Sequence, residues 1–204
     1  MFIVFEGTDG SGTSTQAKIL AENLAKKGLK VFKTAEPSSD FLGKILRETL
    51  QKKHELSPKA FQLLFFADRE QHVQNEVLPA LARGEIVICE RYNWSSIAFG
   101  VSENVDRNFL ENLSSAFLEP DHTFFMNISA EKSLERVILR GEKLEHFETS
   151  EKLKIVQEVM LNLAERSAFT KRSSILNATD SIEAIAKNIE MIVSPIITPL
   201  SKKL

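Results

Sequence analysis

The sequence predicts an α/β fold of three layers, in which a five-stranded parallel sheet is flanked by helices. Short apolar runs alternate with longer amphipathic stretches along the chain, which is the pattern of repeated βαβ units. The short runs are apolar almost throughout, as strands buried on both faces of a parallel sheet are. Neither an internal repeat nor a low-complexity linker divides the sequence. We therefore expect a single domain over residues 1–204, with ligands bound at the carboxyl ends of its strands.

Each element of the first half is indicated by its pattern and by the residues that end it. The apolar run FIVFE opens the chain as a strand, and the helix after it has apolar residues at helical spacing until Gly28. The next strand ends at Glu36-Pro37, and a long helical stretch is expected to be bent or interrupted near Pro79. The expected strands are 2–6 and 30–35, and the expected helices are 14–27, 42–51 and 58–83.

The second half continues the alternation. Gly84 ends the long helical stretch before the apolar run EIVICE, and the runs HTFFMNI and SSILNA are the last two expected strands. A charged connection separates the two helices that lie between those runs. The expected strands are 85–90, 122–128 and 173–178, and the expected helices are 130–139, 150–168 and 182–192.

The composition excludes several classes of protein. A formal net charge of −2 gives no electrostatic attraction to nucleic acid or to an anionic membrane surface. No apolar run approaches the roughly 20 residues of a membrane span, and the first residues lack the features of a signal peptide. A single cysteine, Cys89, excludes an internal disulfide, and four scattered histidines disfavour a zinc site. We expect a cytoplasmic protein.

The segment EGTDGSGTST, between the first strand and the first helix, has most of the frame of a phosphate-binding loop. Gly7 and Gly12 are separated by four residues and hydroxyl side chains follow, but Thr13 stands where that motif has lysine. Backbone N–H groups and the helix dipole can still bind phosphate there. A Gly-rich turn can also be only a tight connection, although its place between a strand and a helix favours phosphate binding. The expected phosphate-binding residues are Gly7, Thr8, Asp9, Gly10, Ser11, Gly12, Thr13, Ser14 and Thr15.

A second polar group follows the third strand. Glu90 at the end of that strand and the hydroxyl of Ser14 offer hard oxygen ligands for Mg²⁺. The adjacent Arg91 has a planar fork of donors that suits phosphate oxygens. A surface ion pair is the alternative, and the loop upstream favours the functional interpretation. Glu90 and Arg91 are therefore candidate catalytic residues.

Five segments together resemble the thymidylate kinase family in order and spacing. They are FEGTDGSGTSTQ, EPSSDFLGKILRETL, LLFFADREQHV, LPALARGEIVICERYNWSSIAFG and RGEKLEHFE, and the similarity runs from Met1 to about Ser194. FADR together with ERYNWSS is its most specific part. The resemblance implies a P-loop nucleoside monophosphate kinase fold and ATP-dependent phosphorylation of thymidine monophosphate (dTMP) with Mg²⁺. It also implies a homodimer packed through helices.

The resemblance implies roles for particular residues. Phe65 would stack on the thymine ring, Arg69 would hydrogen-bond its O4, and Asp9 would contact the deoxyribose 3′-hydroxyl. Phe99, where the family often has tyrosine, would disfavour a 2′-hydroxyl by leaving it unpaired. Core packing is the alternative for Phe65, and ion pairing with Glu70 is the alternative for Arg69. The expected substrate-binding residues are Asp9, Glu36, Pro37, Ser38, Arg47, Phe65, Arg69, Arg91, Ser95, Ser96 and Phe99.

The chain departs from the family around phosphoryl transfer rather than around the base. Thr13 replaces the loop lysine, and His146 lies in an expected lid segment, around residues 136–150, at a position where the family often has arginine. Since cations must surround the γ-phosphate, we expect the lid to supply one. The candidates are Arg136 and Arg140, of which Arg140 is preferred; a solvated charged surface is the alternative.

Three functions are compatible with these observations. The preferred function is an active thymidylate kinase. The second is a kinase for another pyrimidine deoxynucleoside monophosphate, such as deoxyuridylate. The third is a catalytically weakened nucleotide-binding regulatory protein, which Thr13 and His146 favour. Retention of Asp9, Ser14 and Glu90 opposes the third, because drift would remove magnesium ligands as readily as cations.

Overall fold

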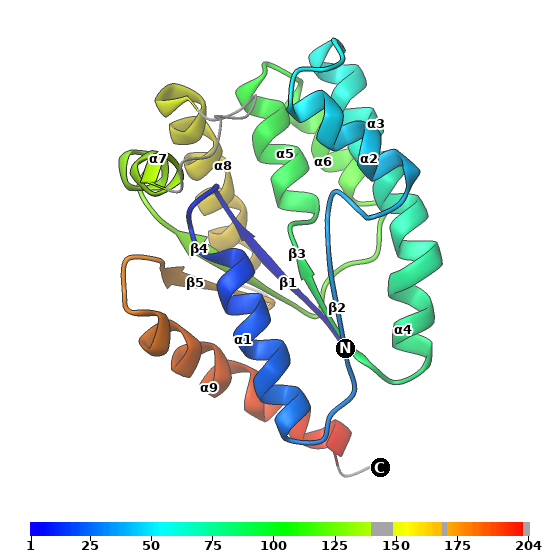
Figure 1. Ribbon diagram of the computed structural model, residues 1–204, viewed down its shortest axis with the longest axis vertical. Helices are drawn as coiled ribbons and strands as arrows, with labels where there is room; N and C mark the ends of the chain where they lie inside the picture. The colour runs from blue at the N-terminus through cyan, green and yellow to red at the C-terminus, as the bar shows by residue number, and fades with distance from the viewer. Residues whose placement is uncertain (140–148, 169–170, 202–204) are drawn as a thin grey trace.

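The computed structural model describes residues 1–139, 149–168 and 171–201, and its centre is a five-stranded sheet (Figure 1). All four strand pairings are parallel, and the strand order is β2-β3-β1-β4-β5. This confirms the predicted fold class, and each strand lies within one residue of its expected bounds. The strands are β1 (Phe2–Gly7), β2 (Val31–Ala35), β3 (Ile86–Glu90), β4 (His122–Asn127) and β5 (Ser173–Asn177).

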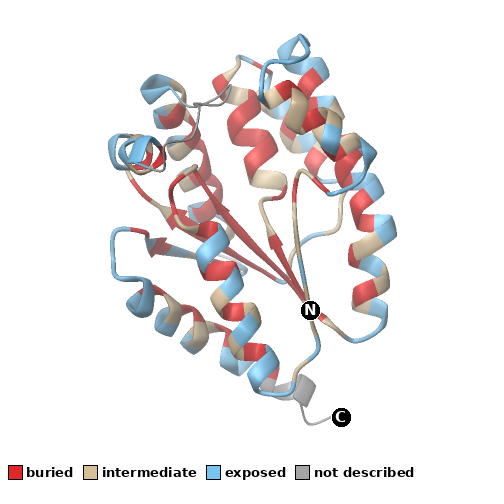
Figure 2. Ribbon diagram, in the orientation of Figure 1, coloured by how far each residue is buried: buried red, intermediate tan, exposed pale blue. Residues whose placement is uncertain are grey.

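The side chains of β1 alternate between two packed layers. Ile3 and Phe5 pack with residues of α1 (Thr13–Lys26) and α9 (Ile182–Ser201) on one face of the sheet. Phe2 and Val4 pack against the helical segments η1 (Val73–Val77) and α4 (Leu78–Ala82). Figure 2 shows β1 buried along its length, as both-face burial of a central parallel strand requires.

The other helices complete the second face. Buried apolar residues of α5, α6 and α8 form one cluster with Phe125 of β4 and Phe66 of α3. Figure 1 shows α1 and α9 apart from this group, so that the sheet lies between two helical layers. The bounds of the helices other than α1, α4 and α9 are α2 (Phe41–Leu50), α3 (Pro58–His72), α5 (Asn93–Ser102), α6 (Arg107–Ser114), α7 (Ala130–Leu139) and α8 (Ser150–Ala168).

The expected interruption of the long stretch 58–83 is confirmed, because the π-helical turn η1 lies one turn before Pro79, which lacks an N–H. Two other helical expectations are corrected. Helices α5 and α6 were not expected, because most of α5 is buried and shows no polar face, while α6 is short. Helix α9 continues to Ser201 instead of ending at residue 192. Among the described residues, no helix has the length and apolar character to cross a bilayer.

Strand register brings the ends of three strands to one place. Glu90, the last residue of β3, lies opposite Phe5 of β1 and Ala35 of β2. The loop after β1, the Glu36-Pro37 turn after β2 and Arg91 after β3 therefore meet at the carboxyl edge of the sheet. This is where the sequence predicted a ligand site.

Candidate active site

The loop between β1 and α1 is shaped by glycine and held by α7. Gly12 has φ +94° and directly precedes α1, a left-handed conformation that glycine adopts without strain. At Gly10, φ is +76° and an added Cβ would lie 2.8 Å from the carbonyl oxygen of Ser133. The hydroxyl of Ser133 also donates to the carbonyl of Asp9 at 2.5 Å. The loop therefore has a fixed shape, with the backbone N–H groups of α1 at its end, as a phosphate site requires.

Thr13 and Ser14 turn their side chains toward Glu90. The Oγ1 of Thr13 donates to Oε1 of Glu90 at 3.0 Å, and the hydroxyl of Ser14 donates to the same oxygen. The structure thus brings together Ser14 and Glu90, the two residues that the sequence placed near a metal, and adds Thr13 to them. It also shows that the residue in the lysine position contributes a hydroxyl to a carboxylate, not a cation.

Arg91 links this loop to the neighbouring cavity. Its backbone is left-handed, with φ 65°, and its Nη1 donates to the carbonyl of Gly7 at 2.9 Å. Its Nη2 contacts Oδ1 of Asp9 at 2.5 Å, and its guanidinium lies over the ring of Phe99. Burial opposes the charge, but the carboxylates of Asp9, Glu90 and Glu6 outweigh burial and raise the pKa of Arg91. Arg91 is therefore a fixed cation.

A cavity of about 190 Å³, which we call the slot, lies beside the loop between α2, α3 and α5. It collects all but one of the expected substrate residues; the exception is Ser38, which lies outside it. Asp9 and Arg91 line its end nearest the loop, and Phe65 and Phe99 contribute aromatic walls. The lining residues are Asp9, Glu36, Pro37, Arg47, Leu50, Gln62, Phe65, Arg69, Arg91, Tyr92, Ser95, Ser96 and Phe99.

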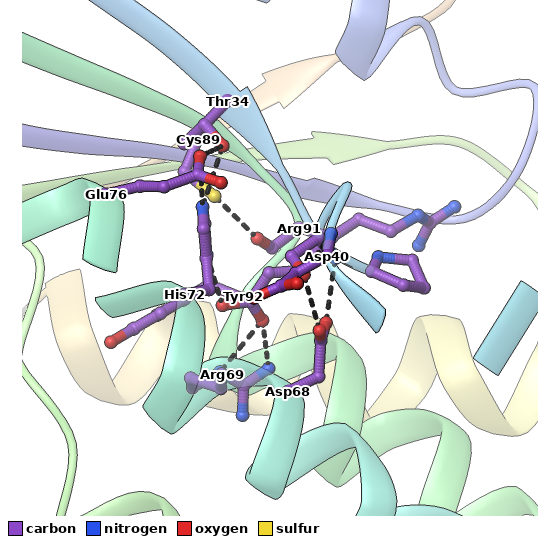
Figure 3. Close-up of polar contacts among 12 residues, drawn as sticks. Thr34, Asp40, Asp68, Arg69, His72, Glu76, Cys89, Arg91 and Tyr92 are labelled. Carbon is purple, nitrogen blue, oxygen red and sulfur yellow. Dashed lines mark hydrogen bonds and ion pairs between the residues drawn. The ribbon is translucent and has the colours of Figure 1, made fainter. Parts of the chain in front are cut away.

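Arg69 is buried in the wall of the slot and held from two sides, as Figure 3 shows in part. Its Nε and Nη2 donate to Oε2 of Glu36 at 2.9 and 2.6 Å, and Nη2 also donates to Oγ of Ser96 at 2.9 Å. The alternative of a surface pair with Glu70 is therefore wrong. The remaining Nη1 is buried without a partner among the described residues. His72 holds the other oxygen of Glu36, with its Nδ1 3.2 Å from Oε1.

Ser38 and Arg47 both stabilise the turn after β2, but only Arg47 also lines the slot. The hydroxyl of Ser38 donates to Oδ1 of Asp68 at 2.5 Å, and its N–H donates to Oδ2 at 2.7 Å. Its expected hydroxyl contribution to the substrate site is thus directed into the fold. Arg47 lines the slot while its Nη1 donates to the carbonyls of Pro37 and Ser38 at 3.0 and 2.6 Å. The Glu36-Pro37 peptide is cis.

Comparison with known proteins identifies the kind of protein to which this arrangement belongs. A family model described as thymidylate kinase matches residues 5–189. The chain belongs to the thymidylate kinase family. It is 39% identical over 197 residues to a probable thymidylate kinase of Pyrococcus horikoshii, with 94% of this chain and 95% of that protein covered.

Two further relatives give the same family. The probable thymidylate kinase of Methanocaldococcus jannaschii is 39% identical over 193 residues, which cover 93% of this chain and 97% of the relative. The thymidylate kinase of Brachyspira hyodysenteriae is 34% identical over 164 residues and 80% of each chain. The similarity to thymidylate kinases therefore extends through the loop, the slot and most of the remaining fold.

Several residues of this family member's site were not singled out by the sequence analysis, among them Gln62 and Tyr92 in the lining of the slot and Glu6, which holds Ser95. Glu6 is fully buried at the end of β1, and its Oε1 accepts the N–H groups of Tyr92, Trp94 and Ser95 at 3.0, 2.9 and 3.2 Å. Its Oε2 accepts the hydroxyl of Ser95 at 2.5 Å. Burial raises the pKa of Glu6, against the lowering effect of Ser95 and Arg91. Glu6 thus fixes the start of α5; a lone charge inside an apolar strand was the available signal.

The two lid candidates have different outcomes. Arg136 lies on α7 against the loop, and its Nη1 and Nη2 donate to the carbonyls of Gly10 and Ala178 at 3.1 and 3.0 Å. It is therefore engaged with the backbone on the side of the loop away from the slot. A second cavity of about 300 Å³ lies there, lined by residues that include Arg136, Ala178 and Asp180. Arg140 lies outside the described residues.

Proposed function

We propose that this chain transfers the γ-phosphoryl group of ATP to dTMP. The observation that carries the proposal is the contact between the two halves of the site. Asp9 belongs to the phosphate loop and also lines the slot, where it pairs with Arg91. A phosphate at the loop and a nucleotide in the slot would therefore approach each other at these two residues. Family membership supports the choice of thymidylate as acceptor.

The slot suits a flat base followed by a sugar phosphate. Phe65 offers a ring for stacking, and the buried Nη1 of Arg69 offers a donor for a base carbonyl. Phe99, at the loop end of the slot, offers no partner to a 2′-hydroxyl, which favours a deoxyribose. Arg47 and Arg91 provide positive charge for the 5′-phosphate.

The chemistry follows from that placement. An oxygen of the dTMP phosphate attacks the γ-phosphorus, a new P–O bond forms, and the bond to the bridging oxygen breaks to release ADP. The chain contributes position and charge: the loop holds the donor phosphates with backbone N–H groups, and Arg91 holds the acceptor phosphate. Arg91 suits this task because Gly7 and Asp9 already fix its guanidinium.

The residues beside the loop fit Mg²⁺. Glu90 and Ser14 supply oxygen atoms that already contact each other. Among the described residues, no group of three His, Cys, Asp or Glu side chains is placed to hold a metal, and Mg²⁺ usually takes few protein ligands together with nucleotide phosphates. When bound, the ion would neutralise charge on the phosphates during transfer. We assign Ser14 and Glu90 as its protein ligands.

The donor nucleotide is proposed to extend to the other side of the loop. The cavity lined by Arg136, Ala178 and Asp180 adjoins Gly10 and Gly12, so a base can lie there while its phosphates reach α1. Arg136 then orders the loop through Gly10, and Arg140 is the remaining proposed cation for the transferred group. That assignment, like the lid at 136–150, is a proposal.

Assembly and location are part of the same proposal. We propose a homodimer packed through helices that include α2 and α3, on which Phe41 and Leu63 are 69% and 44% exposed and serve as probes of the contact. We further propose one domain over residues 1–204 and a cytoplasmic location. Sedimentation equilibrium tests the dimer: Phe41→Asp together with Leu63→Asp should shift it to monomer, and an unchanged mass would contradict this interface.

The decisive test is a coupled assay of ADP release with ATP and Mg²⁺ across the nucleoside monophosphates. We expect dTMP to be the best acceptor and purine monophosphates to be poor, because the slot holds one ring beside Phe65. Faster turnover of deoxyuridylate would favour the second candidate function. Binding of dTMP without turnover would favour the regulatory alternative, for which Thr13 is the specific observation.

A further inference from the structure

Gln62 carries a buried carboxamide that lacks a partner in the described protein. It lies on α3, is 0% exposed, and lines the slot. Both Nε2 and Oε1 are shielded from solvent without a hydrogen-bond partner. Such burial is unfavourable, and buried polar groups in native proteins are nearly always paired. The side chain is therefore built for a partner that the polypeptide itself does not supply.

The position of this side chain is set by α5. A Cβ added at Gly100 would lie 3.1 Å from Cγ and 3.3 Å from Cδ of Gln62. Residue 100 thus has no side chain where Gln62 passes, and that space is shared by the Gln62 side chain and by Leu110, whose Cδ1 would lie 2.6 Å from the added Cβ. This packing holds the amide at the wall of the slot.

Gln62 lies on the same face of α3 as two residues already placed in the slot. Phe65 follows after three residues and Arg69 after a further four, which is helical spacing. The Nη1 of Arg69 is also buried and unpartnered, while its Nε and Nη2 are held by Glu36 and Ser96. The residues that line the slot therefore offer one unsatisfied donor from Arg69 and a donor and acceptor pair from Gln62 on the same face of α3.

We infer that Gln62 is a base-binding residue that reads the imide edge of a pyrimidine. That edge presents a carbonyl, an N3–H and a second carbonyl in a row. Arg69 donates to one carbonyl, Oε1 of Gln62 accepts N3–H, and its Nε2 donates to the other carbonyl. Cytosine instead places an amino donor against the donor of Arg69. The inference rests on the proposed function and adds to it a residue that contacts the base.

The test uses the full chain with Gln62→Met and Gln62→Leu, which remove the amide at similar volume. Gln74→Met is the matched control, since Gln74 is exposed nearby on the same helical stretch and its Nε2 donates only to Glu70. For each protein we would measure the Kd for dTMP and for N3-methyl-dTMP by calorimetry, the KM for ATP, and the thermal midpoint without ligand.

The expected result is a loss of affinity for the thymine base, with no change in the binding of ATP. The Kd for dTMP should rise about 10-fold to 100-fold in both Gln62 variants. We expect wild type to bind N3-methyl-dTMP weakly, and the Kd of the Gln62 variants for it should rise less than about threefold further, because the methyl group has removed the same contact. The KM for ATP and all values of the Gln74 variant should match wild type, and the ligand-free midpoint of the Gln62 variants should not fall below that of wild type.

Several outcomes would overturn the inference. One is wild-type dTMP affinity in a folded Gln62 variant, and another is an equal loss for both ligands. Loss of folding in both variants would show that the amide has a structural role, because removing an unsatisfied amide should not destabilise the ligand-free chain. If wild type phosphorylates dTMP and the variants match it, only this inference fails. If wild type neither binds nor phosphorylates dTMP, the proposed function fails.

Discussion

Replacing Glu36 by glutamine tests how the slot holds its arginine. The side chains of Arg69 and Glu36 are 1% and 4% exposed, so neither charge is screened by water. Glu36→Gln keeps the shape but removes the carboxylate that pairs with the buried Arg69 guanidinium, which also donates a hydrogen bond to Ser96. Breaking a buried pair in this way costs about 3–5 kcal/mol. For a chain of this size, that corresponds to a fall of about 6–20 °C in Tm.

The assay is chemical and thermal unfolding of the ligand-free protein, followed by titration with dTMP. Glu76→Gln is the control, because its 3.7 Å contact with His72 is 31% exposed on the Glu76 side and should be worth less than about 1 kcal/mol. Adding Arg69→Met to Glu36→Gln should recover part of the lost stability, since no buried charge then lacks a partner. In Glu36→Gln alone, dTMP affinity should fall while the KM for ATP holds.

The reasoning about the slot is refuted by either of two results. A loss of less than about 1 kcal/mol in Glu36→Gln would show that water or another group already satisfies Arg69. A double variant less stable than Glu36→Gln would show that Arg69 and Glu36 stabilise the fold through packing rather than through charge compensation.

Three further predictions concern the loop and the strand ends. Glu90→Gln should retain wild-type stability and lower kcat about 10-fold to 100-fold, and normal turnover at saturating Mg²⁺ would make Glu90 structural. Thr13→Lys should change kcat by less than about tenfold, or about 1.4 kcal/mol, and partly rescue Arg140→Ala; a larger activation would indicate an uncompensated missing cation. Because burial raises the pKa of Glu6 above 4.5, its ionisation should cost stability as pH rises from that value through the folded pKa. Urea unfolding should therefore show the free energy of unfolding of Glu6→Gln rising relative to that of wild type over that pH range. A difference in free energy that stays constant with pH would mean that the four hydrogen bonds donated to Glu6 offset the effect of its burial on the pKa.

Local patterns were sufficient for the sheet and for the loop. A strand buried on both faces must be apolar almost throughout, so five such runs could be counted directly from the sequence. A turn with left-handed backbone favours glycine, and Gly10 and Gly12, at φ +76° and +94°, lie in that turn. Parallel strands also end at one edge, which is why Glu90 and Arg91 could be placed beside the loop before any coordinates.

What only the tertiary structure decided were the partners of buried polar groups. Arg69 was expected to face the base, but its pairing with Glu36 joins residues 33 positions apart. Glu6 reaches Ser95 across 89 positions, and no periodicity relates them. Helix α5 was missed because its burial on nearly all sides removes the polar face that reveals a helix.

The role proposed for Gln62 likewise depends on tertiary packing and not on the sequence pattern. In the sequence Gln62 is one polar residue on a helix, and nothing distinguishes it from the exposed Gln74. Its meaning depends on the absence of a side chain at Gly100 and on what the surrounding helices fail to offer its amide. Sequence patterns report whether a residue prefers water or the interior; whether a buried polar atom has a partner depends on distances of a few ångströms between distant segments, which only the folded chain sets.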